Sequence, residues 1–261
     1  MSIQSLFSLT GKTALVAGAS RGIGLAIAKE IAAAGANTIL AARSLDKLEE
    51  HAAALRAQGY QASAEQLDVA GSASIEADGK KFRGKVDILV NVSGTNVRKH
   101  MAAYTKEEYE RIMTTNLHGL FELTQHIGQG MVEAGRGGKI INIGSLTSGL
   151  GLPYLTVYAM TKSGIAGLTR ALAAEWGRHN IQVNCIAPGF IVTDLNREMW
   201  KAGVMKDWLM GTQANPRLGT PEDIAGLAVF LAAPASDYIS GQTIYCDGGY
   251  STTAKWPFEP S

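Results

Sequence analysis

The chain alternates short runs of β-forming residues with longer amphipathic or alanine-rich segments from one end to the other. Alternation of this kind predicts repeated βαβ units with right-handed crossovers, which build one parallel sheet with helices on both faces. Most of the short runs show little in/out alternation, as expected of strands buried on both faces. We therefore expect an α/β fold with a doubly wound parallel sheet of about seven strands, at residues 13–17, 38–42, 62–67, 87–91, 139–143, 182–186 and 243–246.

Helical patterns fill the intervals between these strands, at 25–34, 45–57, 106–134, 157–178 and 222–232. Capping signals at Thr105 and Thr220 agree with two of the helix starts. Segment 194–215 interrupts the alternation with Met199, Trp200, Met205, Trp208 and Met210. We expect it to be an inserted helical pair over a pocket, and the same residues equally fit a small satellite core.

Composition excludes several classes of function. The 24 basic and 23 acidic residues are interspersed, so no basic stripe indicates nucleic acid or an anionic membrane as a partner. Two cysteines and five histidines show no spacing typical of a metal site or a disulfide framework. The first residues lack the pattern of a secretion signal, and the apolar run 224–235 is too short to span a bilayer. We expect a cytoplasmic protein without a metal.

A glycine-rich loop, Gly18-Ala-Ser-Arg-Gly22-Ile-Gly24, directly follows the first expected strand and opens the first helix. Glycines at these places permit a tight turn, let the backbone approach a pyrophosphate and let the helix pack closely on the strand. The helix N-terminus then faces the phosphates. The strand–turn–helix context therefore predicts a dinucleotide site whose first contacts come from Gly18, Ser20, Arg21, Gly22, Ile23 and Gly24.

The end of the second expected strand indicates which dinucleotide binds. A carboxylate about 20 residues after the glycines would hold the 2′-hydroxyl of NAD, whereas an arginine accommodates the 2′-phosphate of NADP. Here the strand ends at Arg43, with no acid before Asp46, and Arg21 adds a second cation. Two guanidinium groups suit a phosphate dianion. We predict NADP(H) as the cofactor.

Tyr158 and Lys162 are four residues apart in an expected helix, so both side chains can point into one cleft. A tyrosine with its ordinary pKa of about 10 is a poor base, and a nearby ammonium group favours its phenolate. Ser145 follows the expected strand 139–143, and open α/β sheets bind ligands beyond the carboxyl ends of their strands. These three residues are candidates for acid/base chemistry.

Together the motifs resemble those of the short-chain dehydrogenase/reductase family of the Tyr-x-x-x-Lys type, over roughly residues 9–250. The resemblance implies a Rossmann fold, one dinucleotide-binding and catalytic domain over 1–261, and hydride transfer that interconverts a ketone and a secondary alcohol. The motifs appear in the family's order as Gly18, Gly22, Gly24, Asp68, Val69, Asn91, Gly94, Asn116, Ser145, Tyr158, Lys162, Pro188, Gly189 and Thr193.

The resemblance also implies roles for single residues. Tyr158 would exchange a proton with the substrate oxygen, Ser145 would hydrogen-bond that oxygen, and Lys162 would hold the nicotinamide ribose. Asn116 would anchor a water that leads protons to solvent. The remaining cofactor contacts would be the adenine at Asp68 and Val69, the riboses at Asn91 and Gly94, and the nicotinamide at Pro188, Gly189, Ile191 and Thr193.

Three departures from the family pattern concern rigidity rather than chemistry. Ala17 stands where the family usually has threonine or serine, and Val92 where it has asparagine, which removes polar links between neighbouring strands. Segment 71–85 is expected to form a short helix, weakened by Gly79 and Gly84.

The substrate is indicated less directly. The triplet Arg98-Lys99-His100, with residues 180–184 and the closing Asp247-Gly-Gly249, resembles the sugar-acid branch of the family, which includes gluconate 5-dehydrogenases. Arg98 or Lys99 could fix a substrate carboxylate, or the triplet could be a solvated loop. A 3-oxoacyl thioester or general ketone reductase is the alternative enzyme, and a non-catalytic dinucleotide sensor is the alternative of another class.

Family resemblance further implies a homotetramer in which the helices at 106–134 and 157–178 pair across subunits. The tail 255–258, which contains Trp256 and Phe258, is apolar and broken by a proline. It is expected to dock on a surface rather than to join the sheet.

Overall fold

The computed structural model describes residues 2–194, 196–201 and 203–253, so the tail 255–258 lies outside the described residues. Seven strands form one parallel sheet in the order β3-β2-β1-β4-β5-β6-β7, which confirms the doubly wound Rossmann topology. The strands are β1 (Thr13–Ala17), β2 (Asn37–Ala42), β3 (Ala62–Gln66), β4 (Ile88–Asn91), β5 (Gly138–Ile143), β6 (Ile181–Pro188) and β7 (Thr243–Cys246).

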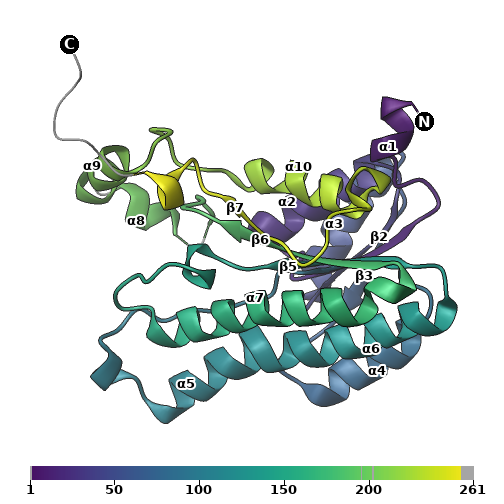
Figure 1. Ribbon diagram of the computed structural model, residues 1–261, viewed down its shortest axis with the longest axis horizontal. Helices are drawn as coiled ribbons and strands as arrows, with labels where there is room; N and C mark the ends of the chain where they lie inside the picture. Colours follow the sequence, from purple (N-terminus) through teal and green to yellow (C-terminus); the bar gives the residue numbers. More distant parts are fainter. Residues whose placement is uncertain (1, 195, 202, 254–261) are drawn as a thin grey trace.

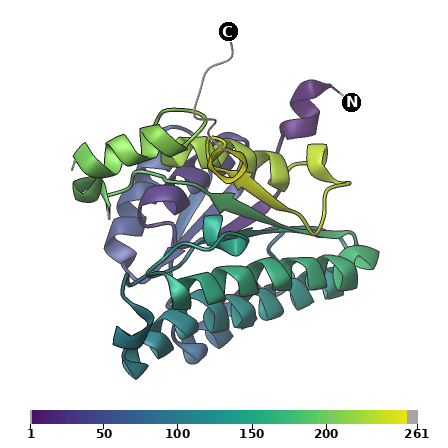
Figure 2. The same cartoon turned by 60° about the vertical axis from the view of Figure 1, so that its left-hand side comes forward.

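Helices cover both faces of the sheet (Figure 1). One layer contains α2 (Gly22–Ala33), α3 (Leu45–Ala57) and α10 (Pro221–Ala232), and the other contains α4 (Ser72–Phe82), α5 (Lys106–Met113), α6 (Gly119–Ala134) and α7 (Thr156–Trp176). The two layers stay on opposite sides of the sheet when the molecule is turned (Figure 2). A short helix, α1 (Ile3–Phe7), was not predicted and lies beside the 3-10 turn η5 (Pro234–Ser236).

The core lies on both faces of the strands, which explains their lack of in/out alternation. Leu15, Leu89 and Ile140 belong to the cluster that packs on α6, while the next residue of each of these strands belongs to the cluster that packs on α2 and α10. Alternate side chains of a strand point to opposite faces, so both must be apolar here.

The predicted helix starts are confirmed where their caps form. Thr105 and Glu108 make a reciprocal capping box at α5, and Thr220 with Asp223 makes one at α10 behind a first-turn proline. The helix expected at 25–34 begins earlier, at Gly22, because the glycine loop already forms its first turn. Expected helix 106–134 is one helical path interrupted by the π segment η2 (Thr114–His118).

Segment 194–215 contains two short helices, α8 (Arg197–Lys201) and α9 (Gly203–Thr212). Phe190 joins them to the body: its ring meets Trp200 at 5.7 Å, Trp208 at 5.5 Å and Tyr250 at 5.0 Å between centroids, all edge to face. Tyr250 begins the 3-10 turn η6 (Tyr250–Thr252). These aromatic rings form the satellite core.

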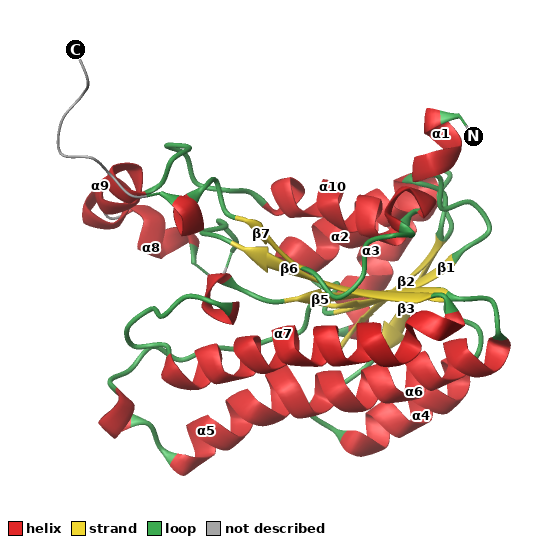
Figure 3. Ribbon diagram, viewed as in Figure 1, coloured by secondary structure: helices red, strands yellow, loops and turns green. Residues whose placement is uncertain are grey.

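Strand order reverses between β1 and β4, because the chain leaves β1 toward β2 and returns to β4 on the other side. The carboxyl ends of these strands open at the left of Figure 3, where the loops after β5 and β6 also emerge. Ligands of open α/β sheets bind in the crevice at such a switch point. Among the described residues, no helix has the length and apolarity that crossing a bilayer requires.

Candidate active site

The loop between β1 and α2 leaves no room for a side chain at two of its glycines. Gly18 has φ of +101°, and a Cβ there would lie 2.7 Å from the backbone nitrogen of Ser93. A Cβ on Gly24 would lie 2.1 Å from the carbonyl oxygen of Gly18, so α2 packs directly on the loop. Arg21 is the N-cap of α2 and its side chain makes no capping bond, which leaves the N–H groups of the first turn to an anion.

Two arginines stand beside this loop. Arg21 and Arg43 are both exposed, and they follow β1 and β2, which are adjacent in the sheet. Within the described part of the chain neither forms an ion pair. The ring nitrogen Nε2 of His51 is 3.3 Å from the carbonyl oxygen of Ser20, within hydrogen-bond distance. Ile23 packs against the core. Ser20 and Ile23 thus anchor the loop to the rest of the protein, while Arg21 and the neighbouring Arg43 are exposed.

Asp68 and Val69 follow β3 on the same edge of the sheet. The Asp68 carboxylate accepts the backbone N–H of Ala70 at 3.0 Å, and its own N–H donates to Ser74 at 3.1 Å, which fixes the turn into α4. Val69 is buried. A Cβ added to Gly119 would lie only 1.6 Å from the carbonyl oxygen of Val69. The backbone of this loop therefore packs directly on the backbone at the start of α6.

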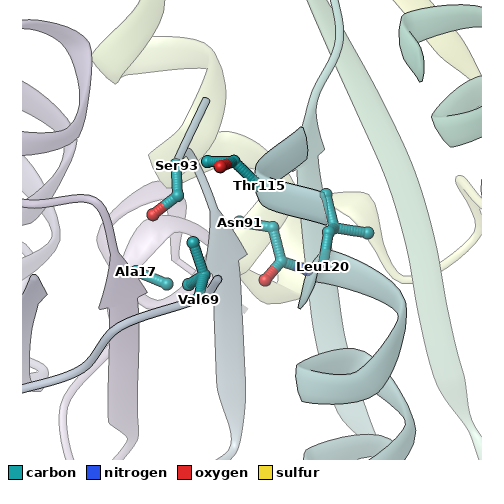
Figure 4. A pocket seen from close by; sticks show the side chains of 6 residues that line it. All are labelled: Ala17, Val69, Asn91, Ser93, Thr115 and Leu120. Carbon is teal, nitrogen blue, oxygen red and sulfur yellow. The ribbon is translucent and has the colours of Figure 1, made fainter. Parts of the chain in front are cut away.

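A cavity of about 10 Å³ lies between the carboxyl ends of β1 and β4, a volume that admits about one water (Figure 4). Ala17, where the family usually has a hydroxyl, forms part of its wall. The expected loss of polar links is limited to side chains, because the Ala17 carbonyl accepts the N–H groups of Val92 at 2.9 Å and Ser93 at 3.0 Å. The other residues lining the cavity are Val69, Asn91, Ser93, Thr115 and Leu120.

Asn91 at the end of β4 is committed to the interior. Its amide nitrogen donates to Thr124 of α6 and to Asn142 of β5, both at 2.9 Å, and Asn142 donates in turn to Thr169 of α7 at 3.0 Å. This buried chain ties two strands to two helices. The side chain of Asn91 is therefore fixed in place where it lines the small cavity between β1 and β4.

Ser145, Tyr158 and Lys162 converge above the end of β5. Ser145 stands between β5 and the 3-10 turn η3 (Leu146–Ser148), where its hydroxyl accepts the N–H of Thr147 at 3.2 Å. Its side chain is close enough to Tyr158 to lower the pKa of the phenol. One turn further along α7, the ammonium of Lys162 donates to the carbonyl of Ile143 at 2.7 Å and lies 5.6 Å from the Tyr158 ring centroid. Ser148 links the two elements by donating to the Lys162 carbonyl at 3.0 Å.

The electrostatic balance at these residues is set mainly by burial. Burial raises the pKa of Tyr158, while the hydrogen bond from Ser145 and then the charge of Arg98 lower it. Burial lowers the pKa of Lys162 to about 8, against a smaller opposite effect of the Cys185 thiol. The Tyr158 phenol thus keeps its proton at neutral pH, while Ser145 and Arg98 favour its anion.

Asn116 lies in the π segment η2, fully buried beside the same cleft. Its amide oxygen accepts the N–H of Thr95 at 2.7 Å, and its amide nitrogen donates to the Thr95 carbonyl at 2.8 Å and to Thr161 at 3.3 Å. A Cβ on Gly94 would lie 3.5 Å from Asn116 Oδ1 and 3.8 Å from Lys162 Nζ. Asn116 therefore clamps the loop after β4 against α7.

The loop after β6 closes the other side of the cleft. A Cβ on Gly189 would lie 2.6 Å from Cα of Asp247, so the loop is packed on the segment after β7. Ile191 is buried, and the N–H of Thr193 donates to Asn196 at 2.8 Å. Thr193 faces the glycine loop, since its methyl carbon is 3.4 Å from a Cβ built on Gly22. A groove of about 510 Å³ continues outward between α2, the start of α10, residues 192–194 and Arg197.

The basic triplet divides into residues with different surroundings. Lys99 donates to Glu108 of α5 at 2.6 Å. Arg98 is exposed, forms no ion pair with another described residue, and is near enough for its charge to lower the pKa of Tyr158. Arg98 is therefore the cation of the triplet that is near Tyr158 and is not paired with another described residue.

Comparisons with known proteins agree with this geometry. The model of a family described as enoyl-(acyl carrier protein) reductase matches residues 18–251. Gluconate 5-dehydrogenase of Gluconobacter oxydans is 36% identical, over 97% of this chain and 100% of that protein. A 3-oxoacyl-(acyl-carrier-protein) reductase of Pseudomonas aeruginosa is 40% identical, over 93% of this chain and 98% of that protein.

Solved structures give the same result. A gluconate 5-dehydrogenase from Burkholderia cenocepacia, in complex with NADP and tartrate, superposes with a TM-score of 0.93 at 36% identity. The superposition covers 97% of this chain and 100% of that one. Sequence likeness and fold therefore extend together over nearly the whole molecule.

Proposed function

The chain belongs to the short-chain dehydrogenase/reductase family, and on this premise we propose that it interconverts a ketone and a secondary alcohol on a sugar acid or related polyol. It is an NADP-dependent oxidoreductase that acts on CH–OH and C=O groups. The observation that carries the substrate class is the position of Arg98, an exposed cation near Tyr158 whose neighbour Lys99 is already paired with Glu108.

The chain's own residues fit the cofactor. Gly18 and Gly24 allow backbone-to-backbone packing, because a Cβ would meet Ser93 at the first and the Gly18 carbonyl at the second. The first turn of α2 offers its N–H groups to a pyrophosphate. The exposed positions of Arg21 and Arg43, after the adjacent strands β1 and β2, support binding of the 2′-phosphate of the adenosine, because each guanidinium can make two charge-assisted hydrogen bonds. We propose the Asp68–Val69 turn for the adenine, and residues 91–94 and 188–193 for the riboses and nicotinamide.

When bound, NADPH supplies the hydride that reduces the carbonyl carbon of the substrate. The Tyr158 hydroxyl donates its proton to the carbonyl oxygen, and the Ser145 hydroxyl holds that oxygen by a hydrogen bond. Lys162 stabilises the resulting phenolate by its charge and holds the nicotinamide ribose. Asn116 orders the proton path back to Tyr158. In the oxidative direction each proton moves the other way.

Arg98 gives the site a preference for acids. A guanidinium offers a carboxylate two parallel hydrogen bonds, which fix both position and orientation. The relatives named gluconate 5-dehydrogenase act on a sugar acid, and the tartrate bound to one of them is a hydroxylated carboxylate. Both facts support a substrate in which a carboxylate and several hydroxyls accompany the ketone.

The test is NADPH consumption by the purified protein with 5-keto-D-gluconate, a 3-oxoacyl thioester and an uncharged ketone, with NADH in parallel. We expect turnover on the keto acid, a KM about tenfold or more higher in Arg98→Met, and unchanged kcat. Tyr158→Phe should bind NADPH as the wild type does and lose about 10²- to 10⁴-fold in turnover. Arg21→Gln with Arg43→Gln should weaken NADPH relative to NADH.

A second candidate, reduction of 3-oxoacyl thioesters, is favoured by the reductase of Pseudomonas aeruginosa and by the apolar segment 194–215. Turnover confined to the thioester, with Arg98→Met indistinguishable from wild type, would establish this candidate against the sugar acid. NADPH binding without turnover on any substrate would instead indicate a dinucleotide sensor.

The domain arrangement is part of the proposal. Residues 1–261 form one dinucleotide-binding and catalytic domain, and residues 194–215 act as a lid over the substrate. The aromatic contacts of Phe190 support this role, because they hold α8 and α9 directly behind the loop that borders the nicotinamide. Packing as a satellite core and service as a lid are compatible.

Assembly and compartment complete the proposal. Phe121 of α6 and Met160 of α7 are both 47% exposed, as is Tyr109 of α5 at 40%, and these helices cover the same face of the sheet. Such a face favours pairing of these helices across subunits of a homotetramer. Light scattering on the purified protein measures its mass directly. Two free cysteines are typical of a cytoplasmic protein, where we place the enzyme.

A further inference from the structure

Tyr154 has a backbone conformation that its residue type rarely adopts. Its φ is +66°, and the other described non-glycine residue with positive φ is Asn180, whose side chain tolerates that region. An aromatic residue there is strained and persists only where its surroundings hold it. Tyr154 ends the loop that leads into α7, four residues before Tyr158.

Within the described residues, the Tyr154 carbonyl and ring both contact residues of one segment, residues 95–104. The Tyr154 carbonyl oxygen accepts the N–H of Lys99 at 3.0 Å. The Tyr104 hydroxyl donates to the Val97 carbonyl at 2.5 Å, and its oxygen lies 3.4 Å from the Tyr154 carbonyl. The Tyr154 ring meets His100 edge to face, 4.8 Å between centroids. Backbone and ring of Tyr154 therefore bind the same segment.

In that segment, Arg98 lies between Thr95 and Lys99, which are both held by hydrogen bonds. Asn116 holds the backbone of Thr95, and Glu108 holds the ammonium of Lys99. Tyr154 holds the backbone of Lys99, the residue directly after Arg98. The backbone that carries Arg98 is thus tied to the conformation of Tyr154.

We propose that Tyr154 is a positioning residue: its left-handed backbone and its ring fasten residues 97–100 so that Arg98 faces Tyr158 and receives an acidic group of the substrate. The identity of the acid rests on the proposed function, whereas the fastening itself does not. Strain at a functional site is acceptable here because the conformation sets the distance between a binding group and a reacting group.

Three substitutions separate the ring from the backbone. Tyr154→Phe keeps both, Tyr154→Gly removes the ring but adopts positive φ without strain, and Tyr154→Ala removes the ring and keeps the strain. We expect the KM for the keto acid to rise about tenfold in Tyr154→Ala and less in Tyr154→Gly, with Tyr154→Phe near wild type and kcat preserved in all three. The KM for an uncharged ketone should not change.

A second readout does not need an acidic substrate. Ser145 and Arg98 are near enough to lower the pKa of Tyr158, and the Lys162 ammonium lies 5.6 Å from the Tyr158 ring centroid. His100, Lys99 and Glu108 are the other ionisable groups on or against the loop. If Arg98 swings away, the alkaline limb of the pH–rate profile moves to higher pH with any ketone that turns over. Tyr154→Ala should therefore shift this limb upward, and Arg98→Met should shift it by a similar amount.

The decisive comparison is the double variant. Adding Tyr154→Ala to Arg98→Met should change neither the KM nor the profile further, because the group being positioned is already gone. Equal KM values for Tyr154→Ala and wild type, an equal loss on charged and uncharged ketones, or additive effects in the double variant would overturn the proposal. Failure of the wild type on every keto acid, with the shift of the limb intact, would reject the substrate class and leave the fastening supported.

Discussion

Replacing Lys162 with methionine should stabilise the protein at neutral pH while it abolishes turnover. Lys162 is 3% exposed as a residue, and burial lowers the pKa of its ammonium from 10.5 to about 8. At about 1.4 kcal/mol per pKa unit, holding it charged at pH 7 costs about 3 kcal/mol of folding free energy. Methionine fills nearly the same space without a charge, so this cost disappears.

An opposing loss limits the gain. The Lys162 ammonium donates to the Ile143 carbonyl at 2.7 Å, and leaving that buried carbonyl unpaired costs about 1–3 kcal/mol. The net stabilisation at pH 7 is therefore about 1 kcal/mol. Above pH 10.5 the wild-type lysine is neutral in both the folded and the unfolded chain, so its burial costs little. The missing hydrogen bond to Ile143 is then the main difference, and the methionine variant should be the less stable of the two.

The sign of the pH dependence follows from proton binding. Between about pH 8 and 10.5 the unfolded chain holds the Lys162 proton and the folded chain does not, so wild-type stability from this group rises with pH across that window. Urea unfolding at pH 7 and pH 10, without NADPH and at one protein concentration, measures the difference between the variants. Exposed Lys47, changed to methionine, serves as the control and should follow wild type.

The crossing of the two stability curves is the critical result. If Lys162→Met is less stable than wild type at both pH values by the same amount, the buried charge is not costly and the reasoning fails. A pH-dependent difference that also appears in Lys47→Met would mean that bulk charge, rather than the buried site, produces it.

Two further changes test the packing and the caps. Gly119→Ala should destabilise the protein by about 3 kcal/mol in urea unfolding, because its Cβ would lie 1.6 Å from the Val69 carbonyl oxygen, whereas Gly226→Ala in open space on α10 should stabilise it by about 0.5–1 kcal/mol; equal effects would refute the contact. Asp223→Asn should cost about 1–2 kcal/mol at pH 7, since hydrogen bonds from Arg217 foremost and from Thr220 lower the pKa of Asp223 to about 2. The stability from Asp223 is present above its ordinary pKa of 3.8 and is lost as pH falls toward 2, so the difference in acid unfolding should shrink over that range; a difference that persists at pH 2 would contradict the assignment.

The strands and the candidate catalytic pair could be predicted because each depends on short-range pattern. Strands buried on both faces must be continuous apolar runs, and two side chains four apart on a helix must share a face. The structure places Tyr158 and Lys162 accordingly on α7, with Ser145 at the end of β5. The roles of these residues remain predictions that the variants test.

Other features depend on contacts across the fold and left no local pattern. The π segment η2 continues the apolar periodicity of its neighbours, so 106–134 had the pattern of a single helix. Gly79 was interpreted as a weakness of α4, yet a Cβ there would lie 2.7 Å from His126 of α6, so the glycine permits close helix packing. Arg98 and Lys99 were equivalent in sequence until the structure placed Glu108 beside Lys99.

The hydrogen-bond ladder between β1 and β4 has a consequence for divergence within the family. The glycine loop follows β1 and the loop with Gly94 follows β4, and the pairing of Ala14 to Ala17 with Ile88 to Asn91 fixes one loop against the other. Main-chain groups make this ladder, so the aliphatic side chains along it can be exchanged as long as volume and apolarity are kept. Much of the sheet can thus change in sequence while this pairing keeps the two loops in register, which is consistent with identities of only 36–40% to relatives that match the chain over nearly their whole length.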